Sequence, residues 1–114
     1  MTVVIWHNPR CSKSRAALKL LEEKGIDHEI RRYLEDGPSA EEIRAALTAL
    51  DLPAIELVRA GEKAFKDAGL TRASDEDALV AAMEQHPILI ERPIVFNGSK
   101  AAIGRPPEAV LDLF

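Results

Sequence analysis

The sequence predicts an α/β fold with a mixed four-stranded sheet, flanked by helices and carrying an inserted helical block. A continuous apolar run near the N-terminus is typical of a strand covered on both faces, and residues at helical spacing follow it. The middle of the chain carries successive helix start and stop signals. The last third holds two short apolar runs around Asn97-Gly98, a strong signal for a β-hairpin. This order of elements is most simply assembled as one mixed sheet.

The first three elements form a β-α-β unit. The apolar run is Val3–Trp6, and the helical pattern after it ends at Lys24-Gly25, a typical C-terminal stop. Residues 28–34 give a weaker strand pattern of mixed polarity. Strands joined through a helix usually pair in parallel, so we expect the first two strands to be parallel neighbours.

Helical signals fill roughly residues 36–86, which we expect to be an insertion into the domain. Ser39 with Glu42 makes a capping box, and apolar residues then recur on one helical face. Two glycines break the next segment into short helical pieces. Ser74 is expected to cap a further helix, which Pro87 closes.

The C-terminal segment returns to strands. Residues 94–96 and 101–103 are expected to pair antiparallel across the Asn97-Gly98 turn, giving the third and fourth strands. Pro106-Pro107 then opens a final helix that carries apolar residues.

Length and composition bound the class of protein. With 114 residues, 46 % hydrophobic and 30 % charged, the chain fits a single domain, residues 1–114. A net charge of −4 without a basic stripe argues against a nucleic-acid binder, and no apolar run approaches the roughly 20 residues that span a membrane. One cysteine allows no internal disulfide, and no secretory pattern is recognisable, so we expect a reducing, cytoplasmic location.

Cys11 stands where the first strand turns into the first helix. The start of a helix presents unpaired backbone N–H groups and a partial positive charge, which favour a thiolate and bind oxyanions. Arg10, Lys13 and Arg15 add three cations, and no apolar residue flanks the cysteine before Ala16. A lone cysteine is otherwise often a small buried apolar residue. In this cationic turn, a reactive nucleophile is the favoured interpretation.

Three polar neighbours have two interpretations each. His7 either donates to the thiolate as imidazolium or ends the strand as a satisfied side chain. Ser12 and Ser14 either donate hydroxyls to the thiolate or a bound anion, or cap the helix. Ser14 also occupies the position where a two-cysteine redox motif holds its resolving thiol. An adduct on Cys11 therefore needs a thiol from outside the chain.

No metal centre is predicted, because Cys11 and the three histidines, His7, His28 and His86, show no metal-ligand spacing. No phosphate-binding or dinucleotide-binding glycine motif is present, so we expect no tightly bound cofactor.

Three blocks of residues follow one another in a specific order: 7–15 (HNPRCSKSR), 86–95 (HPILIERPIV) and 104–108 (GRPPE). Together they resemble the arsenate reductases that use glutathione and glutaredoxin, over essentially the whole chain. The resemblance implies a thioredoxin-like fold. It also implies reduction of arsenate to arsenite, with glutathione as co-substrate and glutaredoxin as partner.

The resemblance assigns roles to particular residues. Cys11 matches the nucleophile, and His7 matches the residue that favours its thiolate. Arg59, Arg92 and Arg105 match the arginines that hold the oxyanion, although each taken singly would be an ordinary solvated side chain. Guanidinium groups and a helix N-terminus both suit a tetrahedral oxyanion.

The resemblance also concerns Pro93, which falls where thioredoxin-like proteins place a cis-proline beside the thiol. A cis bond before proline is otherwise uncommon.

Two other functions fit the same residues. One is a thiol oxidoreductase that acts on glutathione mixed disulfides or on another oxyanion. The other is a redox-responsive regulator of the same fold that binds RNA polymerase, although Ser14 replaces the second cysteine of such a switch. Turnover of a glutathionylated peptide without arsenate turnover would favour the first, and a stable polymerase complex without turnover would favour the second.

Overall fold

The computed structural model describes residues 2–114 and divides the chain into two compact units. The first unit joins the segment that ends at Asp36 to Arg92–Phe114, and the second is Gly37–Glu91. The first unit contains β1 (Val3–Trp6), α1 (Ser12–Glu23), β2 (Glu29–Arg31), β3 (Ile94–Asn97), β4 (Lys100–Ile103) and the 3-10 helix η2 (Pro107–Leu113). The second contains α2 (Ala40–Leu50), α3 (Ala54–Leu57), α4 (Lys63–Asp67), α5 (Glu76–Gln85) and the 3-10 helix η1 (Pro87–Leu89).

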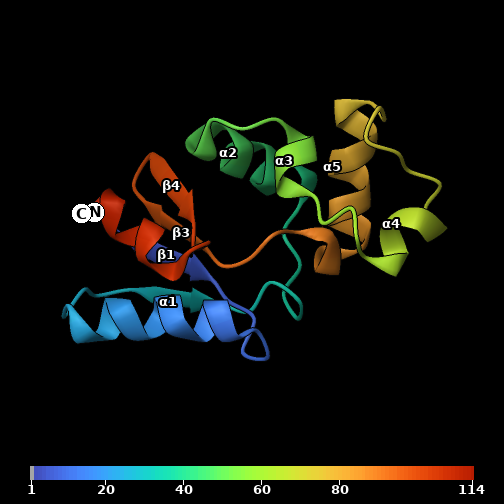
Figure 1. Cartoon of the computed structure of the whole chain (residues 1–114). Coiled ribbons are helices and arrows are strands. Elements are labelled where there is room, and N and C mark those ends of the chain that lie inside the picture. The colour runs from blue at the N-terminus through green and yellow to red at the C-terminus, as the bar shows by residue number, and fades with distance from the viewer. Residues whose placement is uncertain (1) are drawn as a thin grey trace. The chain divides into compact units, whose positions relative to one another are not determined.

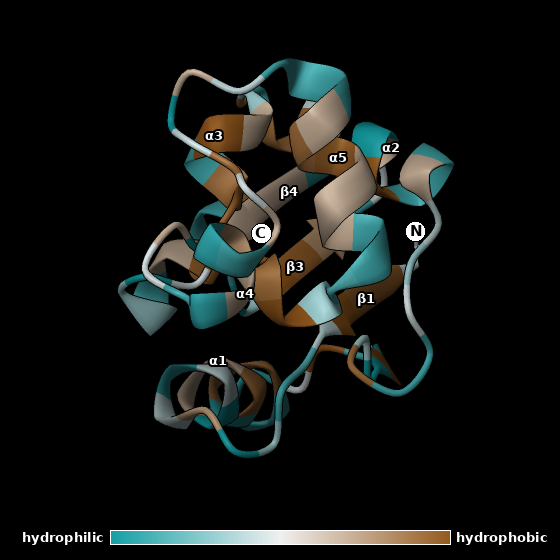
Figure 2. Ribbon diagram, turned by 90° about the vertical axis from the view of Figure 1, so that its right-hand side faces the viewer, coloured by the Kyte–Doolittle hydropathy of each residue, from teal (hydrophilic) through white to brown (hydrophobic). Residues whose placement is uncertain are grey.

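The first unit is built on a mixed four-stranded sheet with the order β2-β1-β3-β4 (Figure 1). β1 pairs in parallel with β2 and antiparallel with β3, and β3 and β4 form an antiparallel hairpin. The predicted parallel β-α-β unit and the predicted hairpin are therefore both confirmed. β1 and β3 are the inner strands, and they are coloured hydrophobic in Figure 2.

A hydrophobic core anchors α1 to one face of this sheet. Ala17 and Leu21 of α1 pack with Val3 and Ile5 of β1, and Val110 of η2 belongs to the same buried cluster. Burying side chains of this size removes apolar surface from water, at about 25 cal/mol per Å². The packing fixes where α1 begins, and hence where the chain passes from β1 into the helix.

Four features differ from the prediction: the extent of β2, the hairpin turn, the type of the last helix and the cap of α5. β2 ends at Arg31 because the chain turns there, with the N–H groups of Glu35 and Asp36 both donating to the Arg32 carbonyl oxygen. The hairpin turn is Gly98-Ser99, since Asn97 still pairs with Lys100; a leading glycine with φ +63° fits a type II′ turn.

The last helix is a 3-10 helix, in which the Ala109 N–H donates to the Pro106 carbonyl oxygen three residues back (2.9 Å). In the second unit, Asp75 is the N-cap of α5 and the Ser74 hydroxyl instead accepts from the Thr71 N–H (2.8 Å).

The second unit is a small helical assembly in which α2 and α3 pack against α5. Its core includes Ile43, Leu79 and Met83, all at most 2 % exposed. Ser39 and Glu42 form the predicted capping box at the start of α2. None of the helices described in residues 2–114 has both the length and the apolar composition that crossing a membrane requires.

Candidate active site

Cys11 is the N-cap residue of α1, at the end of the loop that leaves β1. Its N–H donates to the Asn8 carbonyl oxygen (3.0 Å), and its carbonyl oxygen accepts from the Arg15 N–H (3.0 Å). The Asn8 side chain accepts from the Arg10 N–H (3.0 Å), so local hydrogen bonds tie the turn. The Cys11 side chain makes no capping hydrogen bond and is 9 % exposed. The sulfur thus lies at the start of a 12-residue helix, where backbone N–H groups attract negative charge.

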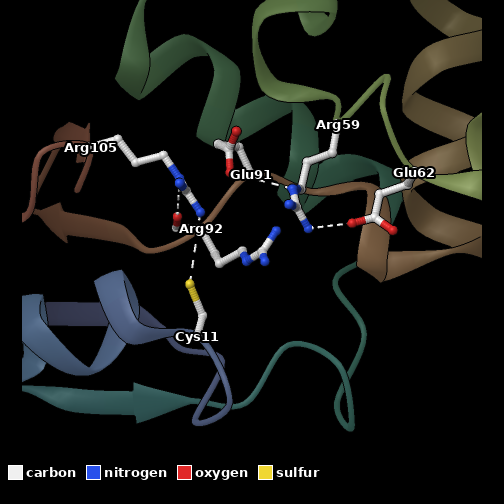
Figure 3. Close-up of polar contacts among 6 residues, drawn as sticks. All are labelled: Cys11, Arg59, Glu62, Glu91, Arg92 and Arg105. Carbon is white, nitrogen blue, oxygen red and sulfur yellow. Dashed lines mark hydrogen bonds and ion pairs between the residues drawn. The ribbon is translucent and has the colours of Figure 1, made fainter.

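The structure places the guanidinium of Arg105 beside this sulfur. Its Nη2 lies 3.8 Å from Cys11 Sγ, although 94 positions separate the two residues (Figure 3). Its Nε donates to the Arg92 carbonyl oxygen (2.9 Å), which links the segment before β3 to the segment after β4. Nε and Nη1 of Arg92 are buried. Two of the three predicted oxyanion arginines therefore belong to the unit that contains Cys11.

Close packing at Gly104 sets the position of Arg105. A Cβ atom at Gly104 would lie only 2.7 Å from Cγ of Pro93, so a larger residue would push these segments apart. The Gly104 N–H also donates to the Pro93 carbonyl oxygen (2.9 Å). The peptide bonds before Pro93 and Pro106 are both cis, as the family resemblance implies for Pro93. Gly104 stands in the sequence block 104–108, but sequence reasoning gave it no role of its own.

His7 and Ser14 form a buried pair within the Cys11 loop. The Ser14 hydroxyl lies 2.7 Å from His7 Nδ1 and accepts from the Asn8 N–H (3.0 Å). Burial lowers the pKa of His7, and the nearby positive charges of Arg32 and Arg15 lower it further. The neutral imidazole is therefore the stable form near neutral pH.

These contacts bear on the alternatives that the sequence leaves open for His7 and the two serines. The contact of His7 with Ser14 fits the alternative of a satisfied side chain at the end of the strand. The lowered pKa, caused by burial and by the charges of Arg32 and Arg15, favours the neutral ring over the imidazolium alternative. Ser14 is fully buried, and its hydroxyl bonds within the loop to His7 and to the Asn8 N–H; its contact with a bound anion stays a prediction. Neither serine caps α1, because the N-cap is Cys11. Ser12 is exposed at the first position of the helix.

Arg59 belongs to the second unit and is held there by carboxylates (Figure 3). Its Nη1 lies 2.6 Å from Glu62 Oε1, and its Nε lies 3.6 Å from Glu91 Oε1. The Arg59 N–H donates to the Leu89 carbonyl oxygen (2.6 Å), so its backbone is fixed as well. Sequence reasoning identified Arg59 but neither glutamate. Only Glu62 had a local signal, an acidic residue three positions after the arginine.

The first unit defines a class of protein. A β-α-β unit followed by an antiparallel hairpin, with a cis-proline before the third strand and a cysteine at the start of the first helix, is a thioredoxin-like arrangement. Within residues 2–114, no group of three or more His, Cys, Asp or Glu side chains is placed to hold a metal ion.

Comparison with known proteins identifies the family. The model of the ArsC family matches residues 6–113, so this chain belongs to the ArsC family. It is 46 % identical over 110 residues to an arsenate reductase of Neisseria meningitidis serogroup A, covering 95 % of this chain and 94 % of that protein. It is 48 % identical over 113 residues to the uncharacterized protein YfgD of Escherichia coli K12, covering 97 % and 95 %.

A solved structure gives the same result. The arsenate reductase from Vibrio cholerae superposes with a TM-score of 0.95 at 46 % identity, covering 100 % of this chain and 98 % of that one. The predicted thioredoxin-like fold is confirmed.

Proposed function

We propose that this protein reduces arsenate to arsenite, with Cys11 as the nucleophile. The observation that carries the proposal is the Arg105 guanidinium, 3.8 Å from Cys11 Sγ at the start of α1. A cation and a helix N-terminus at the same place stabilise negative charge there, both on an attacking sulfur and on a bound oxyanion. The similarity to proteins named arsenate reductases supports arsenate as that oxyanion.

In the proposed reaction, the Cys11 thiolate attacks arsenic, and one arsenate oxygen leaves as water after protonation. Glutathione then bonds to the same arsenic atom and displaces a second oxygen as water. A glutaredoxin thiolate attacks the glutathione sulfur, and the electron pair of the broken arsenic–sulfur bond stays on arsenic, which becomes As(III). Water finally displaces Cys11, which regains its proton, and arsenite leaves.

The arginines and the Cys11 loop have separate roles in this proposal. Arg105 and Arg92 bind the arsenate oxygens and offset the charge that develops during attack. Ser12, exposed at the first position of α1, is a further donor to the oxyanion. His7 and Ser14 keep the loop in the shape that presents the sulfur. The role of Arg59 in arsenate binding stays a prediction from the family resemblance.

An external reductant is part of the proposal because the chain contains one cysteine, and Ser14 occupies the place of a resolving thiol. Glutathione supplies the second thiol on arsenic, and glutaredoxin accepts the glutathione. This chemistry requires a reducing compartment, for which we propose the cytoplasm.

The test is arsenate-dependent consumption of NADPH in the presence of glutathione, glutaredoxin and glutathione reductase. The unaltered chain should turn over, and Cys11→Ser should lower the rate by at least about a thousandfold, because the nucleophile is lost. Lys19→Gln, on an exposed side chain of α1, is the matched control and should leave the rate unchanged.

Three outcomes would contradict the proposal. Full turnover by Cys11→Ser would exclude a cysteine nucleophile. Turnover of a glutathionylated peptide without any arsenate turnover would favour the mixed-disulfide oxidoreductase. A stable complex with RNA polymerase, again without turnover, would favour the regulator.

A further inference from the structure

We propose that two copies of this chain associate through β2, with the two β2 strands antiparallel across a two-fold axis at Ile30. β2 lies at one edge of the sheet, and β1 is the one described element against which it packs extensively. The strand at the other edge, β4, packs against η2 as well as against β3. The outer side of β2 is therefore available to pair with another strand.

The backbone of β2 presents a donor and an acceptor on this outer side. The Arg31 carbonyl oxygen accepts from the His7 N–H (2.8 Å), so the Arg31 backbone groups face β1. Neighbouring residues of a strand turn their N–H and carbonyl groups to opposite sides, so those of Ile30 point away from β1. In an antiparallel pair centred on Ile30, the Ile30 N–H of each copy donates to the Ile30 carbonyl oxygen of the other copy.

The charged side chains of β2 complement those of a second copy in this orientation. Antiparallel pairing centred on Ile30 places Glu29 of each copy opposite Arg31 of the other, which gives two pairs of opposite charge. Parallel pairing in register would set glutamate against glutamate and arginine against arginine. Opposite charges directly across a strand pair stabilise it, and like charges destabilise it. The order of charges along the strand therefore favours antiparallel pairing with itself.

Arg31 is already held in place for such a pair. Its guanidinium carbon lies 5.6 Å from the centroid of the Trp6 ring, and its Nε lies 3.7 Å from Asp36 Oδ2. Glu29 is exposed, so its carboxylate is free to reach across to the other copy. Because Arg31 is fixed before association, the new ion pair costs less side-chain entropy.

An exposed apolar side chain stands at the centre of the proposed interface. Ile30 is 48 % exposed, between the two charged residues of β2. A groove of about 630 Å³ lies along the strand, and its lining residues are Val4, Glu29, Ile30, Arg31, Arg32 and Asp36. Pairing would bring the two Ile30 residues together and remove apolar surface from water. A second copy matches the apolar centre and both signs of charge.

Sedimentation velocity of the unaltered chain, at about 0.01 to 1 mM, is the first test. Pairing over one short strand makes a small interface, so we expect a reversible dimer that increases with concentration. Glu29→Arg should raise the dimer Kd by about tenfold or more, because each new arginine faces Arg31 of the other copy. Glu23→Arg makes the same change of charge on an exposed side chain of α1, and this matched control should leave the Kd unchanged.

Mixing two charge variants tests the register of the pair. Arg31→Glu alone should also dimerise about tenfold more weakly, because it sets a glutamate against Glu29. An equimolar mixture of Glu29→Arg and Arg31→Glu should form a heterodimer, since both cross-strand pairs again have opposite charges. Association that is restored by mixing requires two folded chains, so misfolding of either variant cannot produce it.

Three results would overturn the proposal. An unaltered chain that stays monomeric at about 1 mM would exclude pairing with itself and leave this edge to an extended segment of another protein. A dimer that Glu29→Arg does not weaken would place the contact elsewhere on the chain. Two variants that are folded by circular dichroism but remain monomeric when mixed would exclude the register centred on Ile30. None of these results depends on arsenate turnover.

Discussion

The two units of the molecule hold their arginines in different ways. In the first unit, Arg105 reaches across 94 positions to the Cys11 sulfur and donates to the Arg92 carbonyl oxygen. In the second unit, Arg59 is held by two carboxylates, those of Glu62 and Glu91. A guanidinium beside a sulfur stabilises negative charge on that sulfur. A guanidinium between carboxylates is held in one orientation, and the carboxylates offset its positive charge.

The comparison distinguishes a contact with the proposed nucleophile from contacts with carboxylates, although both involve the same type of side chain. Under the proposed function, the contact with the sulfur gives Arg105 a part in turnover, which its substitution should reveal as lost activity. Paired carboxylates give Arg59 an effect on the packing of its own unit, which substitution of a partner should reveal as a small loss of stability. The following predictions test this difference, beginning with the largest expected effect.

Arg105→Gln should reduce kcat/KM for arsenate by about a hundredfold, because a preorganised donor beside the reacting sulfur is lost. The coupled NADPH assay measures this change. Arg44→Gln is the matched control, since Arg44 forms an exposed ion pair with Asp77 in the second unit and should have no effect. A value for Arg105→Gln within twofold of the unaltered chain would show that the sulfur contact has no catalytic consequence.

Ser14→Ala should destabilise the first unit by about 1–3 kcal/mol, because the substitution leaves the buried His7 ring and the half-buried Asn8 N–H without their hydroxyl partner. Urea denaturation measures the loss. Ser12→Ala, on an exposed hydroxyl two positions earlier, should change the free energy of unfolding by less than about 0.5 kcal/mol. Equal effects of the two substitutions would mean that the buried hydrogen bonds do not hold the loop.

Acidification should destabilise the protein through His7. Its pKa in the folded state is lowered from 6.5 by burial and by the charges of Arg32 and Arg15, so the unfolded chain binds the proton more readily. The stabilising contribution is complete above pH 6.5 and is lost as the pH falls toward the lowered pKa of the folded state.

Unfolding free energies of the unaltered chain and of His7→Gln, measured between pH 7.5 and 5, isolate this contribution, because His28 and His86 are present in both. The slope against pH should be steeper for the unaltered chain. Parallel slopes would show that His7 binds its proton equally well in the two states.

Glu62→Gln should cost only about 0.5–1 kcal/mol, because it removes one partly buried ion pair from Arg59 while Glu91 remains. Glu23→Gln, which breaks the exposed pair with Lys19, is the matched control and should cost close to nothing. Urea denaturation compares the two. A loss of several kcal/mol for Glu62→Gln would mean that Arg59 depends on a single carboxylate.

Sequence patterns predicted the parts of the molecule that depend on neighbouring residues. The apolar run of β1, the Ser39 capping box and the glycine of the hairpin each specify hydrogen bonds that span a few positions. Cys11 at the start of α1 was predictable for the same reason. The turn of the hairpin was displaced by one residue, because strand pairing of Asn97 with Lys100 outweighed the local preference for Asn-Gly.

By itself, then, the sequence determined the order of strands and helices, the cysteine at a helix start and membership of a family through three motifs. The family resemblance named Arg105, but only the tertiary structure places its guanidinium beside the sulfur, because this contact joins segments 94 positions apart. It also decided that Ser14 turns toward His7, and that Glu91 joins Glu62 on Arg59. Such contacts depend on how separate elements pack, which a pattern of neighbouring residues does not specify.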